Sequence, residues 1–412
     1  MHRHSTWLAV IAAAASLVTA AALPGNAATA HDSPSATART AAAAAVTTGA
    51  TFNDPAGDTA AQSRIRDHVI DLVNQAPAGS TLSVAMYTFT EDPVSEALRD
   101  AKARGVGVRV VLDHTSVTMD GGEYDHLASW LGTDRTKSSW VYACPAGRGC
   151  IGSRKIPSDT DGAINHNKFF LFSSTGGAQN VVVQASANMT NLQRTDLFNN
   201  AVTIVDAGLY AGYLSYFGDL LKYGQTAGLS DYYKTPSSGP YKAYFFPRKE
   251  AAGKEYNNDA TTDTVKLILD NVGCAGGTQV RMAANLFTRD EVATKLVALK
   301  NAGCQVVLAA DGASGSMSAG VEGIISGKLT KRVECYEDRA GGNKVGLHSK
   351  YVLVNGTYDG VAGKKLVWTG SHNDTYPALR ANDETLLKID SAAVYDQFKA
   401  NHDRLMSYCE GS

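Results

Sequence analysis

Apolar and polar positions alternate between helical and strand spacing along the first half of the chain. Residues 63–75 carry apolar side chains at helical spacing, namely Ile65, Val69, Ile70, Leu72 and Val73. Residues 82–87 form a mainly apolar run typical of a buried strand, and a second helical pattern ends at Gly105. Residues 106–112 form the next apolar run. This strand–helix–strand order predicts a parallel, right-handed crossover in an α/β fold.

The same pattern returns in the second half of the chain. We expect a strand over residues 280–287, a helix over 290–301 and a further strand over 305–310. Gly105 matches Gly303 at an offset of 198 positions, and the strands that follow match at the same offset. An internal repeat of this size predicts two similar domains that pack about a pseudo-twofold axis.

A His-x-Lys motif opens an apolar run once in each half. The two copies are His166 with Lys168 and His348 with Lys350. Side chains at i and i+2 of a strand share a face, so we expect each imidazole and its ammonium to point the same way. One such motif arises easily by chance, and two at matching places are much harder to obtain.

A second predicted strand follows each motif and ends in a small residue and then Ser-x-Asn. These triplets contain Ser186 and Asn188 in the first half and Ser371 and Asn373 in the second. Two such halves that face each other would offer two imidazoles around a patch suited to an anion. One histidine could then attack a phosphodiester while the other protonates the leaving oxygen. The alternative is that these are ordinary strand residues with satisfied core histidines.

This arrangement resembles the phospholipase D superfamily, in which two His-x-Lys motifs meet at one active site. The resemblance covers nearly all of residues 60–410. It implies an α/β fold of two similar α-β-α sandwich lobes with mixed sheets related by a pseudo-twofold axis. It also implies phosphodiester hydrolysis that needs no metal and no cofactor.

The resemblance assigns roles to residues of this sequence. His166 would attack phosphorus and His348 would protonate the leaving alcohol and later activate water. The groups that would hold the non-bridging oxygens are Lys168, Lys350, Asn188 and Asn373, with Ser186 and Ser371 as further donors or loop supports. The family usually has a carboxylate five positions after each motif lysine, where this chain has Ser173 and Asn355. Tyrosyl-DNA phosphodiesterases also lack that carboxylate, so activity need not be lost.

The family also has a carboxylate after each Ser-x-Asn that holds the second histidine nitrogen. Glu384 fits this position in the second half, and Asn199 stands there in the first. We expect Glu384 to keep His348 protonated, because a nearby carboxylate raises a histidine pKa. Asn199 would leave His166 more readily neutral, as a nucleophile requires, unless it marks a weakened site.

Residues outside the repeat indicate export. Residues 1–30 combine a basic start, an apolar run and a small-residue cleavage site, which predicts a signal peptide rather than a membrane anchor. We expect a flexible leader over 31–55, lobes over 56–224 and 259–412, and a linker over 225–258. The chain has six cysteines, an even number that favours disulfides in an exported protein. We pair Cys144 with Cys150, Cys274 with Cys304, and Cys335 with Cys409.

Charge bears on the substrate. Loss of the signal peptide removes Arg3 alone from the 38 basic residues and none of the 40 acidic ones, so the mature chain is slightly acidic. Proteins that hold long polyanions usually carry a basic surplus. We therefore expect a secreted, monomeric phospholipase D that acts on phospholipid at a membrane or vesicle surface without an obligatory protein partner. An exported nuclease or other phosphodiesterase, and a non-catalytic phosphate- or lipid-binding protein, remain alternatives.

Overall fold

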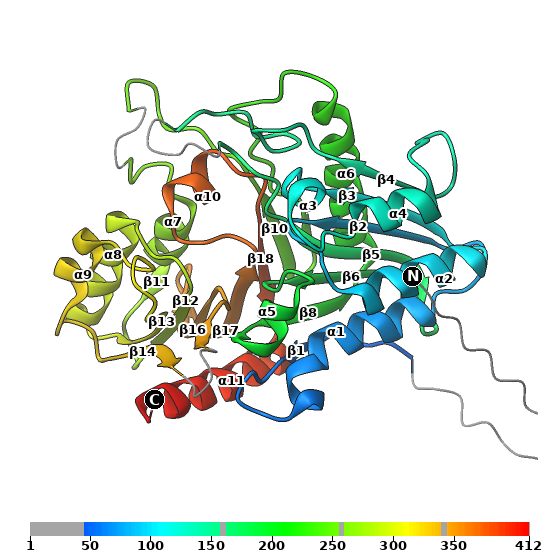
Figure 1. Ribbon diagram of the computed structural model, residues 1–412. Helices are drawn as coiled ribbons and strands as arrows, with labels where there is room; N and C mark the ends of the chain where they lie inside the picture. The colour runs from blue at the N-terminus through cyan, green and yellow to red at the C-terminus, as the bar shows by residue number, and fades with distance from the viewer. Residues whose placement is uncertain (1–44, 157–161, 255–258, 339–343, 412) are drawn as a thin grey trace, which may run out of the picture. The chain divides into compact units, whose positions relative to one another are not determined.

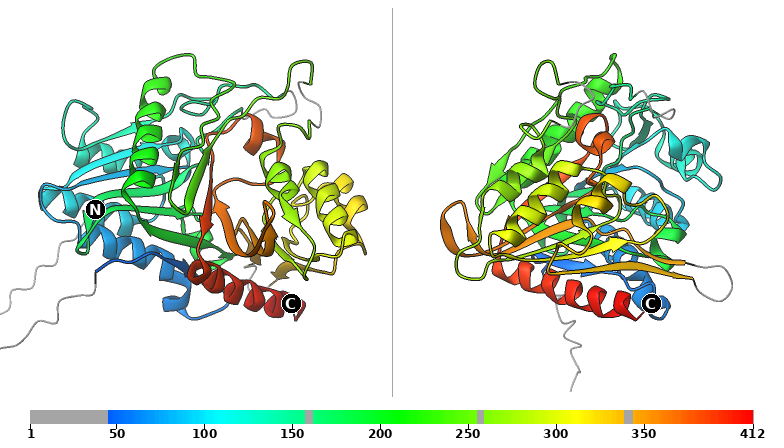
Figure 2. Two further views of the ribbon diagram at one scale, coloured as in Figure 1. Left: turned by 180° about the vertical axis from the view of Figure 1, so that it is seen from behind. Right: turned by 90° about the vertical axis from the view of Figure 1, so that its left-hand side faces the viewer.

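The structure is a computed structural model that describes residues 45–156, 162–254, 259–338 and 344–411. The predicted signal peptide and the leader up to residue 44 lie outside the described residues. Figure 1 shows the two sheets with their flanking helices, and Figure 2 gives two further views. Within the described residues, no helix is both long and apolar enough to cross a membrane.

The first sheet belongs to the N-terminal lobe. Among the described residues it has seven strands, which run across the sheet as β1 (Gly49–Phe52), β8 (Asn200–Val205), β6 (Ala178–Ala185), β5 (Lys168–Thr175), β2 (Thr81–Met86), β3 (Gly107–Leu112) and β4 (Trp140–Ala143). β2, β3 and β4 pair in parallel, and the remaining neighbours pair antiparallel. The sheet is therefore mixed, and the predicted parallel crossover between β2 and β3 is present.

The second sheet repeats this arrangement in the C-terminal lobe. Its matching strands in the described residues run as β10 (Tyr241–Phe245), β18 (Thr385–Asp390), β17 (Val361–Gly370), β16 (Tyr351–Tyr358), β12 (Gln279–Ala284), β13 (Gln305–Asp311) and β14 (Lys331–Asp338). Short strands extend it at β9 (Ser237–Ser238), β11 (Val272–Gly273), β15 (Lys344–Leu347) and β7 (Leu197–Phe198). Each of the first seven strands has the partners and directions of its counterpart in the first sheet.

The structure has strands in two segments that were expected to be a leader and a linker. Part of the segment predicted as a flexible leader forms β1, which pairs with β8. Part of the predicted linker forms β10, which pairs with β18 at the equivalent edge. The aromatic side chains of Phe245 and Phe246 at the end of β10 are buried, so this stretch belongs to the packed core. Each lobe therefore begins with an edge strand that precedes its first helix.

Helices cover both faces of each sheet. Those of the first lobe are α1 (Thr59–Asn74), α2 (Asp92–Ala103), α3 (Thr115–Thr118), α4 (Tyr124–Leu131), α5 (Asn191–Thr195) and α6 (Ala207–Gly224). Those of the second are α7 (Thr264–Asp270), α8 (Asp290–Asn301), α9 (Ala319–Ile325), α10 (Tyr376–Arg380) and α11 (Ala392–Glu410). α1, α2 and α4 pack on one face of the first sheet, and α7, α8 and α9 on one face of the second. α6 and α11 share a central core with the other faces of both sheets.

The sequence fixes many of these elements locally. Thr190 and Thr375 stand at equivalent positions and cap α5 and α10 with their side-chain oxygens. Gly105 and Gly303 adopt φ of 92° and 98° just after α2 and α8, a conformation that glycine takes without strain. The three predicted disulfides, Cys144–Cys150, Cys274–Cys304 and Cys335–Cys409, are all present.

Candidate active site

The two His-x-Lys motifs stand where the chain enters β5 and β16. His166 lies just before β5, which begins at Lys168, and His348 lies just before β16. In both copies the lysine Nζ donates to the carbonyl oxygen of its own histidine at 2.7 Å. Both lysines are buried, whereas the histidines keep 7% and 9% of their surface exposed. The two motifs therefore have the same local geometry, with the imidazoles nearer to solvent than the ammonium groups.

Each imidazole is held by a residue of the other half of the chain. His166 Nδ1 lies 2.8 Å from Glu384 Oε1, and His348 Nδ1 lies 3.0 Å from Asn199 Oδ1. The prediction that Glu384 serves His348 and Asn199 serves His166 is therefore wrong. Both residues do hold a histidine, but the partners are exchanged between the lobes.

Backbone pairing across the lobes explains the exchange. The His166 N–H donates to the Asp383 carbonyl oxygen, and the His348 N–H donates to the Phe198 carbonyl oxygen, both at 2.9 Å. Asp383 directly precedes Glu384, and Phe198 directly precedes Asn199. Two side-chain bonds also cross, from Thr385 Oγ1 to Asn167 Oδ1 at 2.8 Å and from Asn200 Nδ2 to Thr369 Oγ1 at 2.7 Å. The two motifs thus meet at one place between the lobes.

The serines of both Ser-x-Asn triplets hold the histidine partners. Ser371 Oγ donates to Glu384 Oε2 at 2.5 Å, and Ser186 Oγ donates to Asn199 Oδ1 at 2.8 Å. Ser186 and Ser371 are fully buried and Asn199 is 1% exposed. Ser186 and Ser371 therefore lie behind the imidazoles as supports rather than as phosphate donors, and Asn199, which was also expected among the substrate-binding residues, orients His348.

The asparagines of the triplets are better placed to meet a ligand. Asn188 and Asn373 are each 7% exposed. Asn373 Oδ1 accepts a long bond of 3.5 Å from the backbone N–H of Leu286. Asn188 Oδ1 has no hydrogen-bond partner in the described part of the chain.

Two residues beside the lysines were not singled out from the sequence. Tyr87 places its ring centroid 5.4 Å from Lys168 Nζ and 5.1 Å from the ring centroid of His166. Asn285 Oδ1 lies 3.5 Å from Lys350 Nζ. Tyr87 and Asn285 share the repeat offset of 198, so the repeat itself was the signal that could have found them.

Asp113 and Asp311 support the backbone that leads into each motif. Asp113 Oδ2 accepts from the Asn165 N–H at 2.7 Å, and Asp311 Oδ1 accepts from the Leu347 N–H at 2.9 Å. Asp113 directly follows β3 and Asp311 is the last residue of β13, positions that share the repeat offset of 198. Their role is to fix the residue before each histidine.

A sequence model described as "Cardiolipin synthase, PLD-like domain" matches residues 69–221 and 270–406. The chain belongs to the phospholipase D-like family. The two matched segments each contain one His-x-Lys and one Ser-x-Asn. No curated protein sequence matches this phospholipase D-like chain.

Solved structures share the phospholipase D-like fold at low identity. A phosphatidylserine synthase from Haemophilus influenzae matches with a TM-score of 0.53 and 12% identity, over 87% of this chain and 86% of the other. A polyphosphate kinase from Porphyromonas gingivalis matches with a TM-score of 0.54 and 13% identity. The match covers 87% of this chain but only half of the kinase.

Neighbouring groups fix the orientation of the Asn199 amide. Its Nδ2 donates to the carbonyl oxygen of Gln193 at 3.0 Å, to Gln193 Oε1 at 3.0 Å and to the carbonyl oxygen of Leu197 at 3.1 Å. Oδ1 must therefore face His348, where it can only accept. Neutral His348 consequently carries its proton on Nδ1, and its Nε2 is a free base.

Burial and charge act together on the imidazoles of this phospholipase D-like site. Burial lowers the pKa of His166 well below 6.5, and Lys168 and Lys350 lower it further when they are charged. Burial and the same two lysines, Lys350 before Lys168, also lower the pKa of His348 well below 6.5. Both imidazoles are therefore neutral near pH 7 before an anion arrives.

The groups around the imidazoles titrate near neutral pH. Burial lowers the pKa of Lys168 to about 7, although Glu384 and Asp113 oppose it. Burial raises the pKa of Glu384 to about 7, against the opposing charge of Lys168. Within the described residues, no group of three or more His, Cys, Asp and Glu side chains is arranged to hold a metal ion.

Proposed function

We propose that this chain is an exported phosphodiesterase that cleaves the head-group bond of phospholipids through a covalent phosphohistidine on His166. The observation that carries this proposal is the unequal pair of crossed contacts. A carboxylate, Glu384, stands behind His166, and a neutral amide, Asn199, stands behind His348.

The exchange of partners removes the argument that an amide beside His166 keeps it neutral. Glu384 instead suits His166 to the role of nucleophile through the transition state. Its carboxylate accepts a hydrogen bond from the Nδ1–H group, so the lone pair of a neutral His166 is on Nε2. When Nε2 bonds to phosphorus, the imidazole ring gains positive charge. The adjacent carboxylate stabilises that charge in the transition state, when it develops.

Asn199 suits His348 to the role of general acid. An amide stabilises imidazolium less than a carboxylate does, so protonated His348 gives up its Nε2 proton readily. The negative charge of a bound phosphodiester favours that protonated form and offsets the effect of burial. His348 therefore becomes an acid when substrate is present.

Four further groups would hold the phosphate. Lys168 and Lys350 come from the two motifs, and Asn188 and Asn373 come from the two triplets. As Nε2 attacks, charge builds on the non-bridging oxygens. Ammonium and amide donors aimed at these oxygens lower the barrier. Such donors typically contribute about 10²–10³-fold each in rate.

The reaction then runs in two balanced steps. In the first, the bond from His166 Nε2 to phosphorus forms, the bond from phosphorus to the head-group oxygen breaks, and His348 gives its proton to that oxygen. In the second, water attacks phosphorus, His348 takes a proton from the water, and the bond to His166 breaks. An alcohol that replaces water in the second step would give transfer instead of hydrolysis.

Three observations favour a phospholipid as the substrate. The matching family description names cardiolipin synthase, and one similar fold belongs to a phosphatidylserine synthase. Leu192 is 57% exposed four residues after Asn188, and Leu286 is 38% exposed where its N–H meets Asn373. Large apolar side chains exposed beside a site suit contact with acyl chains.

The deciding experiment offers the purified protein phosphatidylcholine vesicles and plasmid DNA in parallel, with a chelator present. We expect choline release, intact DNA and no direct effect of the chelator. His166→Ala should abolish release, whereas His126→Ala should not, because His126 is an exposed histidine outside the site. Cleaved DNA with untouched lipid would assign the chain to the nucleases.

Trapping the intermediate tests the chemistry separately from the substrate. Denaturation at alkaline pH preserves a nitrogen–phosphorus bond, and mass spectrometry should then locate the adduct on His166. An adduct that persists in His166→Ala would make the other histidine the nucleophile. If neither lipid nor DNA is cleaved and no adduct is trapped, the result would favour a binding protein without turnover.

A further inference from the structure

Comparison of the two repeats identifies a polar pair, His372 and Asp374, that has no polar counterpart in the first lobe. Ser186 matches Ser371 at an offset of 185 positions, so Ala187 corresponds to His372 and Met189 to Asp374. The first lobe therefore folds with an alanine and a methionine around its catalytic asparagine. The second lobe places two titratable side chains at the same positions, where the fold does not require them.

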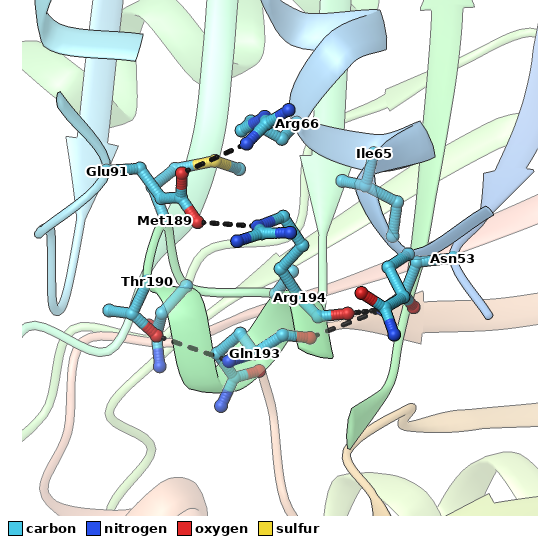
Figure 3. A pocket seen from close by; sticks show the side chains of 11 residues that line it. Asn53, Ile65, Arg66, Glu91, Met189, Thr190, Gln193 and Arg194 are labelled. Carbon is cyan, nitrogen blue, oxygen red and sulfur yellow. Dashed lines mark hydrogen bonds and ion pairs between the residues drawn. The ribbon is translucent and has the colours of Figure 1, made fainter. Parts of the chain in front are cut away.

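In the first lobe, the region beside the Ser-x-Asn loop has no titratable group at either of these two positions. Figure 3 shows its cavity beside the Ser-x-Asn loop, with Glu91 between Arg66 and Arg194. Glu91 pairs with Arg194 at 3.1 Å and with Arg66 at 3.6 Å. Met189 lines this cavity without any charge. The charged groups there are paired with one another.

The second lobe leaves a buried imidazole unsatisfied. His372 is 4% exposed, and within the described residues neither of its ring nitrogens has a hydrogen-bond partner. The ring of Phe246 packs on it with centroids 4.5 Å apart. A buried polar group without a partner destabilises the fold, so a second observation must account for it.

A small cavity supplies that observation. It has a volume of about 20 Å³ and is lined by His372, Asp374 and Lys350, with apolar walls from Val265, Ile268, Trp368 and Leu386 among others. A water molecule needs about 10–15 Å³ of such space and two to four polar partners. His372, Asp374 and Lys350 can provide such partners, so the cavity suits one ordered water.

We propose that Asp374, His372 and one water form a proton reservoir for Lys350, which rests on the proposed role of Lys350 in binding phosphate. Before phosphate arrives, Asp374 carries a proton and Lys350 is neutral. When phosphate binds, the proton leaves Asp374, passes through the water that His372 orients, and ends on Lys350 Nζ. The site thereby gains an ammonium group for the phosphate without taking a proton from solvent.

The electrostatics agree in direction with this transfer. Burial raises the pKa of Asp374 to about 8, with Asp263 adding to the rise and Arg289 and Lys350 opposing it. Burial, followed by the charge of Lys168, lowers the pKa of Lys350 well below 10.5. Both directions favour a proton on the acid rather than on the amine until an anion binds.

His372 stays neutral throughout and serves as the support of the water. Burial lowers its pKa to about 4, although Glu384 and Asp263 oppose this, and Arg289 and His166 lower it further. A neutral imidazole offers one donor and one acceptor. It can therefore fix the water between Asp374 and Lys350.

Calorimetry of inorganic phosphate binding tests the reservoir. Titration near pH 7 in buffers of different ionisation enthalpy counts the protons taken up with phosphate. Asp374→Asn removes the internal source, so this variant should take up about one proton more than the unchanged protein. The titration of phosphate itself is common to both proteins and cancels in the difference. Glu123→Gln removes a buried carboxyl group bonded to Ser95, away from the site, and should leave the count unchanged.

A second measurement keeps the test valid if Asp374→Asn does not fold. The infrared band of a protonated carboxyl group in the unchanged protein should weaken when phosphate binds. His372→Ala introduces the residue that the first lobe has at the equivalent position. This variant should bind phosphate more slowly and remain folded. Equal proton counts, or an infrared band that phosphate leaves unchanged, would overturn the reservoir alone. If the unchanged protein does not bind phosphate, both the reservoir and the proposed function are overturned.

Discussion

Asn199 and Glu384 occupy equivalent positions and differ because their neighbours differ. Acceptor oxygens of Gln193 and Leu197 surround the Asn199 nitrogen, so an amide is required there. Glu384 receives hydrogen bonds on both oxygens, from His166 and Ser371, so a carboxylate fits. The hydrogen-bond partners of Asn199 and Glu384 thus determine why one half has an amide and the other a carboxylate.

Glu384→Gln should slow phosphoenzyme formation by about 10²–10⁴-fold, the range that a positioned partner of a catalytic histidine contributes. The amide keeps the shape but removes the charge that stabilises the phosphorylated imidazole. Rapid-quench measurement of the first turnover reports this step directly. The control is Glu123→Gln, which should react at the original rate. An unchanged first turnover in Glu384→Gln would remove the electrostatic role from this carboxylate.

Asn199→Asp should have two separable effects. A carboxylate oxygen in place of Nδ2 would face three acceptors, which costs about 1–3 kcal/mol of stability by loss of satisfied partners. The new charge beside His348 also raises its pKa, because it stabilises imidazolium. Since His348 must be protonated to act as an acid, the alkaline limb of the activity profile should move to higher pH. A profile that moves to lower pH would contradict the assignment.

The sequence predicted the candidate reacting residues but not how they pair. Two copies of His-x-Lys and Ser-x-Asn identified the imidazoles, lysines and asparagines because the repeat made chance unlikely to explain them. Glu384 follows His348 in the chain, so proximity in sequence suggested the wrong partner. The exchange depends on long-range backbone bonds from His166 to Asp383 and from His348 to Phe198, which no local pattern encodes.

At the scale of elements, the sequence pattern did not predict the strands β1 and β10. β1 and β10 have four and five residues and stand in stretches rich in small or turn-forming residues. Such segments are read as leader and linker, because only their pairing with β8 and β18 makes them strands. The central strands and long helices were found because each buries an apolar face with a clear period.

Gly370 at the end of β17 permits the close approach of β18. A Cβ at this position would stand 2.1 Å from the carbonyl oxygen of Thr385. Gly370→Ala should therefore separate the two strands, cost about 1–3 kcal/mol as overpacking does, and displace both Ser371 and Glu384. We expect a lower thermal midpoint and a loss of activity greater than the loss of folded protein.

Gly218 in α6 offers the matched control. A Cβ there meets no atom within 4 Å, so Gly218→Ala should be neutral or stabilising by up to about 1 kcal/mol. The first lobe has Ala185 where the second has Gly370, which shows that the constraint belongs to this strand pair alone. A Gly370→Ala protein as stable and active as the Gly218→Ala protein would contradict the close-approach argument.

At the scale of the whole molecule, duplication has made one site from two incomplete halves. Each lobe supplies one imidazole and the partner of the other imidazole. A lobe on its own would therefore lack both the second histidine and the support for its own. The functional unit is the pair of lobes, although each lobe has its own sheet and helices.

The three disulfides should rank by the length of chain that each closes. Cys335–Cys409, Cys274–Cys304 and Cys144–Cys150 span separations of 74, 30 and 6 residues. Loop-closure entropy gives losses of about 4.5, 3.7 and 2.4 kcal/mol for their removal. Paired Cys→Ser variants, compared by urea unfolding, should lose stability in that order.

Activity should follow the opposite order, because the chain beside the shortest disulfide contacts Asp383, which holds the His166 backbone. The chain after Cys150 donates from the Ile151 and Gly152 N–H groups to the carboxylate of Asp383. The carbonyl oxygen of Asp383 in turn accepts from the His166 N–H. Loosening this loop would shift His166, and small displacements of a nucleophile reduce rates steeply. Cys144→Ser with Cys150→Ser should thus be the most stable and the least active of the three variants. Equal loss of activity in all three, measured where each is fully folded, would show that the loop does not position His166.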